Sequence, residues 1–388
     1  MDYYKESLKL HKDNKGKIEV KSKIKIKNKL DLSLAYTPGV AEPCREIAKD
    51  SNKVYEYTAK QNTVAVITDG SAVLGLGNIG AEASLPVMEG KAILFKEFAN
   101  IDAWPIALAS QDVKKNIETI KNIAPMFGGI NLEDIKAPEC FEIEEALQDL
   151  GIPVMHDDQH GTAIVVLAAI INSLKLVNKR INNIKIVING AGSAGMAIAK
   201  LLIAYGATAG RIILLDTKGA LAKTRKDIKK NKYKFEIAKT TNENNEEGDL
   251  NRMITLADIF IGVSVAGVLK SGMVKKMNKD AIVIAMANPE PEIYPDVAKK
   301  AGARIVATGR SDYANQVNNV LVFPGVFRGA LDIRAKQITT EMKLAAAKAL
   351  ANSQKKLSYD KIVPDVFNKE VVKNVANAVK REWRKANL

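Results

Sequence analysis

The stretch IKIVINGAGSAG, residues 184–195, decides the fold that this sequence predicts. A run rich in β-branched residues, 184–189, leads directly into a glycine-rich turn, and residues 196–202 behind the turn are good helix formers. Strand, glycine turn and helix in this order make up the GxGxxG fingerprint, in which the helix N-terminus receives a pyrophosphate. We therefore predict an α/β fold with a Rossmann-type, doubly wound nucleotide domain that binds NAD.

Each residue of the turn has a specific task in this prediction. The first glycine permits a tight turn, the second lets backbone approach a pyrophosphate, and the third lets the helix pack on the strand. The candidate cofactor contacts in the turn are Gly190, Gly192, Ser193, Ala194 and Gly195.

The following apolar run, residues 211–215, ends at Asp216, which can accept a hydrogen bond from a ribose 2′-hydroxyl. A 2′-phosphate would meet a like charge at Asp216, so this residue favours NAD. The neighbouring Lys218 could pair with that phosphate, and NADP use stays open.

Three further strands are expected at residues 257–264, 281–287 and 304–308, each ending in small or polar residues. Ligands of open α/β sheets lie beyond the carboxyl ends of the strands. We therefore expect Ser264 and Asn288 to line the cofactor cleft.

Composition narrows the function classes. A chain of 388 residues is long enough for about two domains. The formal net charge of +14 comes from lysines spread over the sequence without arginine and aromatic clusters. This favours a solvated basic surface that draws in anions over a nucleic-acid interface. Two distant cysteines, no apolar run of membrane-spanning length and no N-terminal apolar core predict a cytoplasmic protein without membrane contact.

A second GxGxxG, residues 75–80, competes for the dinucleotide. It follows an expected strand at 63–68 and precedes an expected helix at 81–89 and a strand at 91–96. The later turn has the cleaner strand and the better placed acid, so the earlier one is expected to shape a substrate site. Lys91 beside that site could have a shifted pKa if it is buried. Further upstream, residues 18–26 alternate apolar and polar side chains and predict a strand, and Pro38-Gly39 places Tyr36 on a loop.

Two pairs of carboxylates, Glu133-Asp134 and Asp157-Asp158, follow short apolar runs. Oxygen ligands from two loops suit Mg²⁺ or Mn²⁺ better than zinc, although surface acids at strand ends would give the same pattern. The segment from His156 to His160 resembles a zinc protease motif but lacks its glutamate, so we discard that chemistry.

Taken together, these segments resemble malic enzymes of the short, prokaryotic type over essentially the whole chain. The blocks that carry the resemblance are SLAYTPGVAEPC, TDGSAVLGLGNIGAEASLPVMEGKAILFKEFANIDAWP, GGINLEDIKAPECFEIE, VMHDDQHGTAIVVLAA, NGAGSAG, ANPEPEI and GRSDYANQVNN. The resemblance implies oxidative decarboxylation of (S)-malate to pyruvate and CO₂, and it assigns the dinucleotide to the turn at 190–195. It also implies a homodimer.

The resemblance assigns roles residue by residue. Lys91 corresponds to the general base, Tyr36 to the general acid, and Asp157 to a charge partner that orients the acid–base group. The implied metal ligands are Glu133, Asp134 and Asp158, and the implied substrate contacts are Asn288 and Asn319. Long eukaryotic relatives carry a malate-binding arginine where this chain has Ala72, so that contact stays open.

The expected division is a catalytic and metal-binding domain over 1–160 and a nucleotide domain with C-terminal helices over 161–388. Two other functions stay possible at this point. One is another NAD-linked 2-hydroxy-acid or amino-acid dehydrogenase, which would need no Mg²⁺ and release no CO₂. The other is a basic nucleic-acid-binding protein with a vestigial nucleotide domain, which salt-sensitive retention on DNA would indicate.

Overall fold

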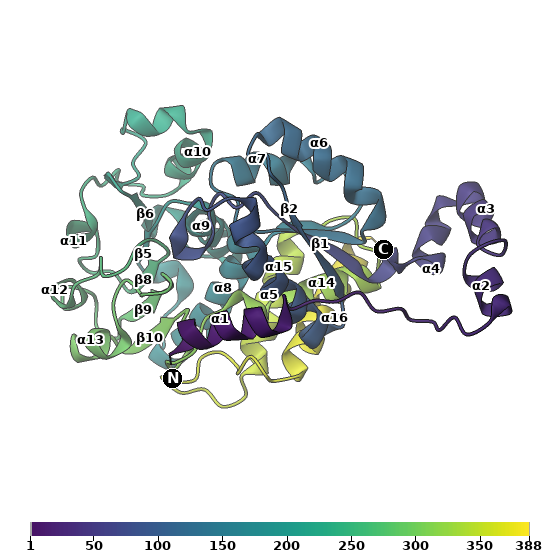
Figure 1. The fold of residues 1–388 in the computed structure, drawn as a ribbon. Coiled ribbons are helices and arrows are strands. Elements are labelled where there is room, and N and C mark those ends of the chain that lie inside the picture. The colour runs from purple at the N-terminus through teal and green to yellow at the C-terminus, as the bar shows by residue number, and fades with distance from the viewer. Residues whose placement is uncertain (1, 388) are drawn as a thin grey trace.

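The computed structural model describes residues 2–387 and begins with four helices, α1 (Tyr3–Asn14), α2 (Lys29–Ala35), α3 (Ala41–Lys49) and α4 (Val54–Tyr57). Helix α1 lies on the body of the molecule, and α2 to α4 form a projecting arm (Figure 1). Figure 1 shows α2 and α3 standing apart from the body of the molecule. The strand predicted at 18–26 is wrong, because this segment is irregular and exposed. Alternation alone does not make a strand where no neighbouring strand offers a hydrogen-bonding partner.

The first sheet is parallel, with the strand order β2-β1-β3-β4. Its strands are β1 (Thr63–Thr68), β2 (Asp102–Ala107), β3 (Gly129–Leu132) and β4 (Val154–His156), and the connecting helices are α5 (Ala81–Ala99), α6 (Val113–Ile123) and α7 (Glu139–Ala146). Because the strands are parallel, all their carboxyl ends meet at one edge.

The strand predicted at 91–96 is wrong, because these residues continue α5. Most buried side chains of α5 are three or four residues apart: Ser84, Met88, Lys91 with its neighbour Ala92, Phe95 and Ala99. That spacing is one face of a helix, and a short apolar run inside it cannot be told from a buried strand by composition. Lys91 therefore points from the inner face of a long helix.

The second sheet has the order β10-β9-β8-β5-β6-β7, in which β7 alone is antiparallel to its neighbour. Its strands are β5 (Ile186–Asn189), β6 (Ile212–Asp216), β7 (Gly219–Ala220), β8 (Ile259–Gly262), β9 (Ile282–Ala285) and β10 (Ile305–Thr308). Counted from β5, this is the 3-2-1-4-5-6 order of a Rossmann domain, with a two-residue hairpin strand in third place. The predicted fold class is confirmed.

Helices cover this second sheet and join it to the first. They are α8 (Asp157–Val177), α9 (Ser193–Tyr205), α10 (Lys232–Thr240), α11 (Leu250–Met253), α12 (Ser271–Val274) and α13 (Pro295–Lys300). Helix α8 is long and apolar enough to cross a membrane, but 72% of its apolar window is buried inside the protein. Its apolar side chains therefore pack in the core of this protein.

The last three helices pack on the connecting helices of both sheets. They are α14 (Phe323–Asp332), α15 (Thr340–Ser353) and α16 (Glu370–Ala386). Phe95 of α5 packs edge-on against Phe323 and Phe327 of α14, with ring centres 4.7 and 5.4 Å apart. One hydrophobic core runs through both sheets. The domain division at residue 160 stays a prediction, and it falls inside α8.

Candidate active site and dinucleotide cleft

Lys91 lies at the centre of the candidate active site. Its Nζ is 2.6 Å from Oδ2 of Asp157, in the first turn of α8, and 2.9 Å from Oε1 of Glu133, directly after β3. The ammonium also stands 4.3 Å from the ring centre of Phe323. The structure thus brings together three of the predicted residues from separate parts of the chain.

The electrostatic surroundings hold Lys91 as a cation in this arrangement. Burial lowers its pKa, but Asp157 and Glu133 more than reverse this effect and raise the pKa above the ordinary lysine value. Burial also raises the pKa of Asp157, to about 7, against the opposing attraction of Lys91. The side chains of both residues are almost completely enclosed. The pair is therefore sensitive to any charge that enters beside it.

Three carboxylates form a cluster next to this pair. Glu133, Asp134 and Asp158 each offer one oxygen, and these oxygens lie within 4.8 Å of one another. The backbone N–H of Asp134 donates to Oδ2 of Asp158 at 2.9 Å. Burial first, and repulsion between the carboxylates second, raises the pKa of Asp134.

This cluster fits a divalent cation. Oδ2 of Asp134 is buried without a hydrogen-bond partner among the residues that the structure describes. Hard carboxylate oxygens converging from two segments are the donor set that Mg²⁺ and Mn²⁺ prefer. A bound dication would cancel the repulsion that raises the pKa values of the cluster.

Asn319 also reaches this site. Its amide nitrogen donates to Oδ2 of Asp157 at 2.6 Å, on the oxygen that Lys91 contacts. Asn288 is exposed in the loop after β9. A Cβ on Gly75 would stand 2.4 Å from the carbonyl oxygen of Asn288, so the first glycine loop packs against that segment.

Sequence reasoning missed several residues that support the site. The amide of Asn131, buried within β3, donates to Oε2 of Glu133 at 2.8 Å. Gly161 leaves room for Asp157, because a Cβ there would stand 1.8 Å from Oδ1. Asn131 could have been noticed in the sequence, because it is a polar residue inside the apolar run before Glu133. Nothing in the sequence indicated the contact between Phe323 and Lys91.

Tyr36 is not brought to this site. It follows α2 on a turn, as the sequence predicts, and 66% of its surface is exposed. Figure 1 shows α2 on the projecting arm, whereas α5 and its Lys91 belong to the body of the molecule. Within residues 2–387, the ion-pair and hydrogen-bond partners of Lys91 include no tyrosine.

The second glycine turn has the geometry of a pyrophosphate cradle. Gly190 has a φ of +121°, and a Cβ there would stand 2.3 Å from the carbonyl oxygen of Val263. A Cβ on Gly195 would stand 1.8 Å from the carbonyl oxygen of Gly190, whereas Gly192 has open space in front of it. Ser193 and Ala194 begin α9, whose N-terminus has no side-chain cap. Unpaired N–H groups therefore face the open side.

A cavity of about 570 Å³ extends from this turn to the end of β6. Its lining includes Gly190, Gly192, Asp216, Lys234 and Ser264. Ser264 accepts a hydrogen bond from the amide of Asn189 at 2.7 Å. No residue of the first glycine loop, 75–80, is among the described residues that line the cavity. The geometry thus favours the later turn for the dinucleotide.

Comparisons with known proteins agree over nearly the whole chain. A family model described as malic enzyme, N-terminal domain, matches residues 15–148, and one described as malic enzyme, NAD binding domain, matches residues 159–383. The chain is 58% identical to a bifunctional malic/malolactic enzyme of Bacillus subtilis, with 98% of this chain and 92% of that protein covered. It is 56% identical to an NAD-dependent malic enzyme of Geobacillus stearothermophilus, with 94% and 76% covered.

Other similar proteins differ in the cofactor that they are named for. An NADP-dependent malic enzyme of Escherichia coli is 47% identical, and the match covers 94% of this chain and 50% of that protein. Among solved structures, a malic enzyme from Pyrococcus horikoshii has a TM-score of 0.95 at 50% identity, with 99% of this chain and 91% of that chain covered.

Proposed function

The chain belongs to the malic enzyme family, and from this premise we propose that it converts (S)-malate into pyruvate and CO₂ while reducing a nicotinamide dinucleotide. The observation that carries the proposal is Lys91, enclosed between Asp157 and Glu133, beside a carboxylate cluster and in the same chain as a pyrophosphate cradle. Another NAD-linked dehydrogenase would need the cradle but would have no use for the carboxylate cluster.

We propose that Glu133, Asp134 and Asp158 hold Mg²⁺ or Mn²⁺. When bound, the dication polarises the C2 oxygen of malate and stabilises the negative charge that develops there as CO₂ leaves. The buried, unpartnered oxygen of Asp134 supports this assignment. The residues at 190–195 and Ser264 are proposed to hold the dinucleotide, which accepts the hydride from C2.

Lys91 is proposed as the base that takes the proton of the C2 hydroxyl. Lys91 can take the proton only in its neutral form, and the carboxylates of Asp157 and Glu133 stabilise its charged form. The negative charge of these carboxylates must therefore be partly neutralised by another group when substrate is bound. Glu133 is one of the proposed metal ligands, and its charge is then shared with the metal. Asp157 stays beside Lys91 and positions it, with Asn319 holding the same carboxylate oxygen.

Substrate contacts are proposed for Asn319 and Asn288. Asn319 stands within the Lys91 site through its hydrogen bond to Asp157, and the exposed amide of Asn288 is available to a carboxylate. Since Ala72 cannot supply the arginine contact of the long relatives, the second carboxylate of malate needs such amide donors.

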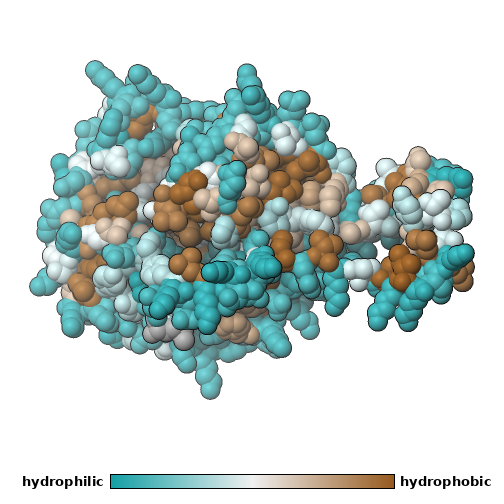
Figure 2. Space-filling view, in the orientation of Figure 1, coloured by the Kyte–Doolittle hydropathy of each residue, from teal (hydrophilic) through white to brown (hydrophobic). Residues whose placement is uncertain are grey.

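Tyr36 is proposed as the acid that delivers a proton to C3 after CO₂ has left, and a second copy of the chain is proposed to supply it. The arm exposes the apolar side chains of Leu30, Leu32, Leu34, Tyr36 and Val40. Figure 2 shows hydrophobic surface on this projecting lobe. Exposed apolar surface of this kind favours a protein interface. A homodimer would bury it and bring Tyr36 to the Lys91 site of the other copy.

Cytoplasmic location, and the absence of nucleic-acid and membrane partners, remain part of the proposal. A small anionic substrate gives the basic surface a use without a nucleic acid, because positive potential draws in malate.

We expect Mn²⁺ binding to release protons and to weaken as the pH falls from about 8 to about 6. Burial and mutual repulsion raise the pKa values of Glu133 and Asp134, so in the metal-free protein these carboxylates retain protons at a pH where free carboxyl groups have lost them. Protons and metal therefore compete, and acid favours the protons. Calorimetric titrations in buffers of different ionisation enthalpy measure both effects.

The control for this titration is Glu139→Gln, which changes a nearby carboxylate outside the cluster. It should leave proton release unchanged, whereas Asp134→Asn should reduce it. Metal affinity that is the same at both pH values would contradict the assignment.

The direct test of the function is malate-dependent reduction of NAD or NADP by the purified protein with Mn²⁺. Reduction that stops on addition of a chelator and yields pyruvate supports the proposal. Accumulation of oxaloacetate without pyruvate would support a simple 2-hydroxy-acid dehydrogenase instead.

A further inference from the structure

Glu292 is a buried carboxylate that the proposed mechanism leaves without a role. It lies in the loop between β9 and α13, and 0% of its surface is exposed. Its Oε1 accepts from the backbone N–H of Ser264 at 2.9 Å, and its Oε2 accepts from the backbone N–H of Ala287 at 3.0 Å. Because both oxygens act as acceptors, the side chain has the hydrogen-bond pattern of an ionised carboxylate.

The negative charge of Glu292 has no cationic partner in the described chain. No lysine, arginine or histidine among residues 2–387 forms an ion pair with it. Burial raises the pKa of Glu292, and the hydrogen bonds from Ala287 and Ser264 oppose this effect. A buried charge without a counter-charge destabilises the folded state. A ligand that brings a positive charge near this carboxylate would offset part of that destabilisation.

The backbone around Glu292 holds the carboxylate in place. A Cβ on Gly262, the last residue of β8, would stand 2.4 Å from Cδ of Glu292, so glycine leaves the room that this side chain occupies. The carbonyl oxygen of Glu292 accepts from the backbone N–H of Leu269 at 3.1 Å. The carboxylate is thus fixed at the carboxyl ends of β8 and β9, where it joins the loops that follow these two strands.

These two loops lie on the nicotinamide side of the proposed dinucleotide cleft. In a Rossmann sheet the dinucleotide crosses the crevice where the strand order reverses, with the pyrophosphate at the glycine turn and the adenosine ribose at the next strand. In this chain the glycine turn follows β5 and the ribose side is β6, so the nicotinamide half extends over β8 and β9. Ser264, directly after β8, lines the same cavity as Gly190.

We propose that the charge of Glu292 stabilises the oxidised nicotinamide ring, which is a cation, relative to the reduced ring, which is neutral. Because Glu292 is enclosed, it acts as a positioning residue, through the loops of Ser264 and Asn288 and through its electric field, without touching the ring. Hydride transfer to the ring removes the positive charge, so the attraction exists before the transfer and is absent after it. The inference rests on the proposed use of a nicotinamide dinucleotide.

The test compares the affinities of the full chain for NAD⁺ and NADH, and in parallel for NADP⁺ and NADPH, by calorimetric titration without malate. Glu292→Gln removes the charge and nearly keeps the shape. We expect it to shift the ratio of the two affinities toward the reduced form by at least about threefold, because the oxidised ring alone loses an attraction. Loss of a purely structural contact would weaken both forms equally. Glu292→Met, a second neutral variant, should shift the ratio in the same direction.

The matched control is Glu290→Gln, which neutralises an exposed carboxylate of the same loop. Solvent screens that charge, so the ratio should stay within about twofold of the wild-type value. Glu292→Asp keeps the buried charge and should also keep the ratio within about twofold.

An unchanged ratio in folded Glu292→Gln would overturn the proposal, and so would a Glu292→Asp variant that shifts the ratio as strongly as the neutral variants. If the ratio shifts as expected but the wild type does not oxidise malate, the proposed function fails and the role of Glu292 stands. If the wild type oxidises malate and the ratio does not move, the proposed function stands and the role of Glu292 fails.

Discussion

Lys91→Ala is expected to lower kcat for malate oxidation by about 10²- to 10⁴-fold, the range over which a positioned proton-transfer group contributes. The variant removes the amino group that lies between Asp157 and Glu133 and leaves the two carboxylates without the lysine that is proposed to take the proton. Steady-state kinetics with saturating malate, Mn²⁺ and dinucleotide measure the effect. Binding of 5′-AMP should be unchanged, because the nucleotide cavity has no contact with Lys91.

Two controls separate chemistry from stability in this experiment. Removing one partner of a buried ion pair is itself destabilising by about 3–5 kcal/mol, so the variant is assayed at a temperature where circular dichroism shows it folded. Lys96→Ala removes an exposed lysine from the same helix, which pairs with Asp102, and should leave kcat near the wild-type value. A folded Lys91→Ala enzyme within about tenfold of wild type would exclude Lys91 as the base.

Tyr36→Phe is expected to have the second largest effect, again about 10²- to 10⁴-fold on kcat, because it removes only the hydroxyl that donates to C3. Tyr57→Phe, on α4 of the same arm, is the matched control and should be nearly silent. A single chain would not explain this loss of activity, because Tyr36 is exposed on the arm and the described partners of Lys91 include no tyrosine.

Mixing the two inactive variants tests whether Tyr36 is supplied by a second copy. In a mixed dimer with the arm exchanged, one site receives an intact Lys91 and an intact Tyr36, and the other receives neither. Random re-association of equal amounts should therefore restore about a quarter of the wild-type activity. If Tyr36 acted within its own chain, every site would carry one defect and mixing would restore nothing.

The fold was largely predictable because its determinants are local. One strand–turn–helix unit is specified by the β-branched run before Gly190, by the glycines and by the helix-forming residues that follow them. The strand order of the second sheet is that of the Rossmann domain which this unit predicts. The resemblance to malic enzymes is likewise confirmed by the comparisons. The roles of the individual site residues stay predictions.

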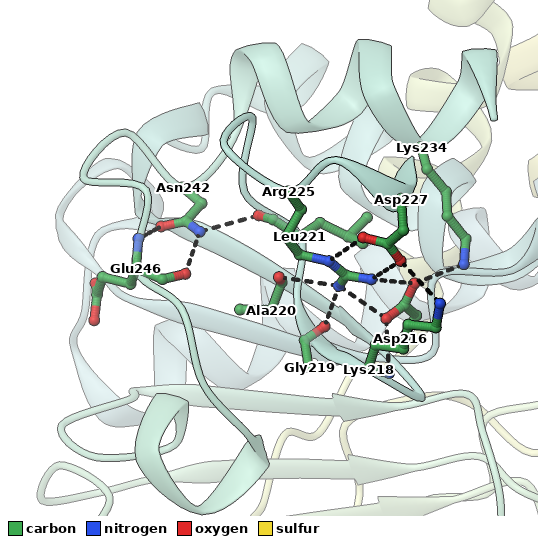
Figure 3. A network of polar contacts seen from close by, with 10 residues as sticks. All are labelled: Asp216, Lys218, Gly219, Ala220, Leu221, Arg225, Asp227, Lys234, Asn242 and Glu246. Carbon is green, nitrogen blue, oxygen red and sulfur yellow. Dashed lines mark hydrogen bonds and ion pairs between the residues drawn. The ribbon is translucent and has the colours of Figure 1, made fainter. Parts of the chain in front are cut away.

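The predictions from sequence failed where tertiary contacts determine the local structure or the charge around a residue. Residues 91–96 were expected as a strand, but the buried face of α5 continues through Phe95, which packs on Phe323 from near the other end of the chain. No local pattern encodes that contact. The charge of Asp216 was weighed against that of Lys218 alone, because the sequence does not reveal that Arg225 and Lys234 fold back onto Asp216 (Figure 3).

The most direct test of the whole proposal is to compare CO₂ release with dinucleotide reduction during turnover of (S)-malate labelled at C4, with Mn²⁺ and with a chelator. We predict one labelled CO₂ for each dinucleotide reduced, with pyruvate as the product, and loss of both signals when the metal is removed. Dinucleotide reduction that continues without CO₂ release, or that persists in the chelator, would contradict a metal-dependent decarboxylating site built around Lys91.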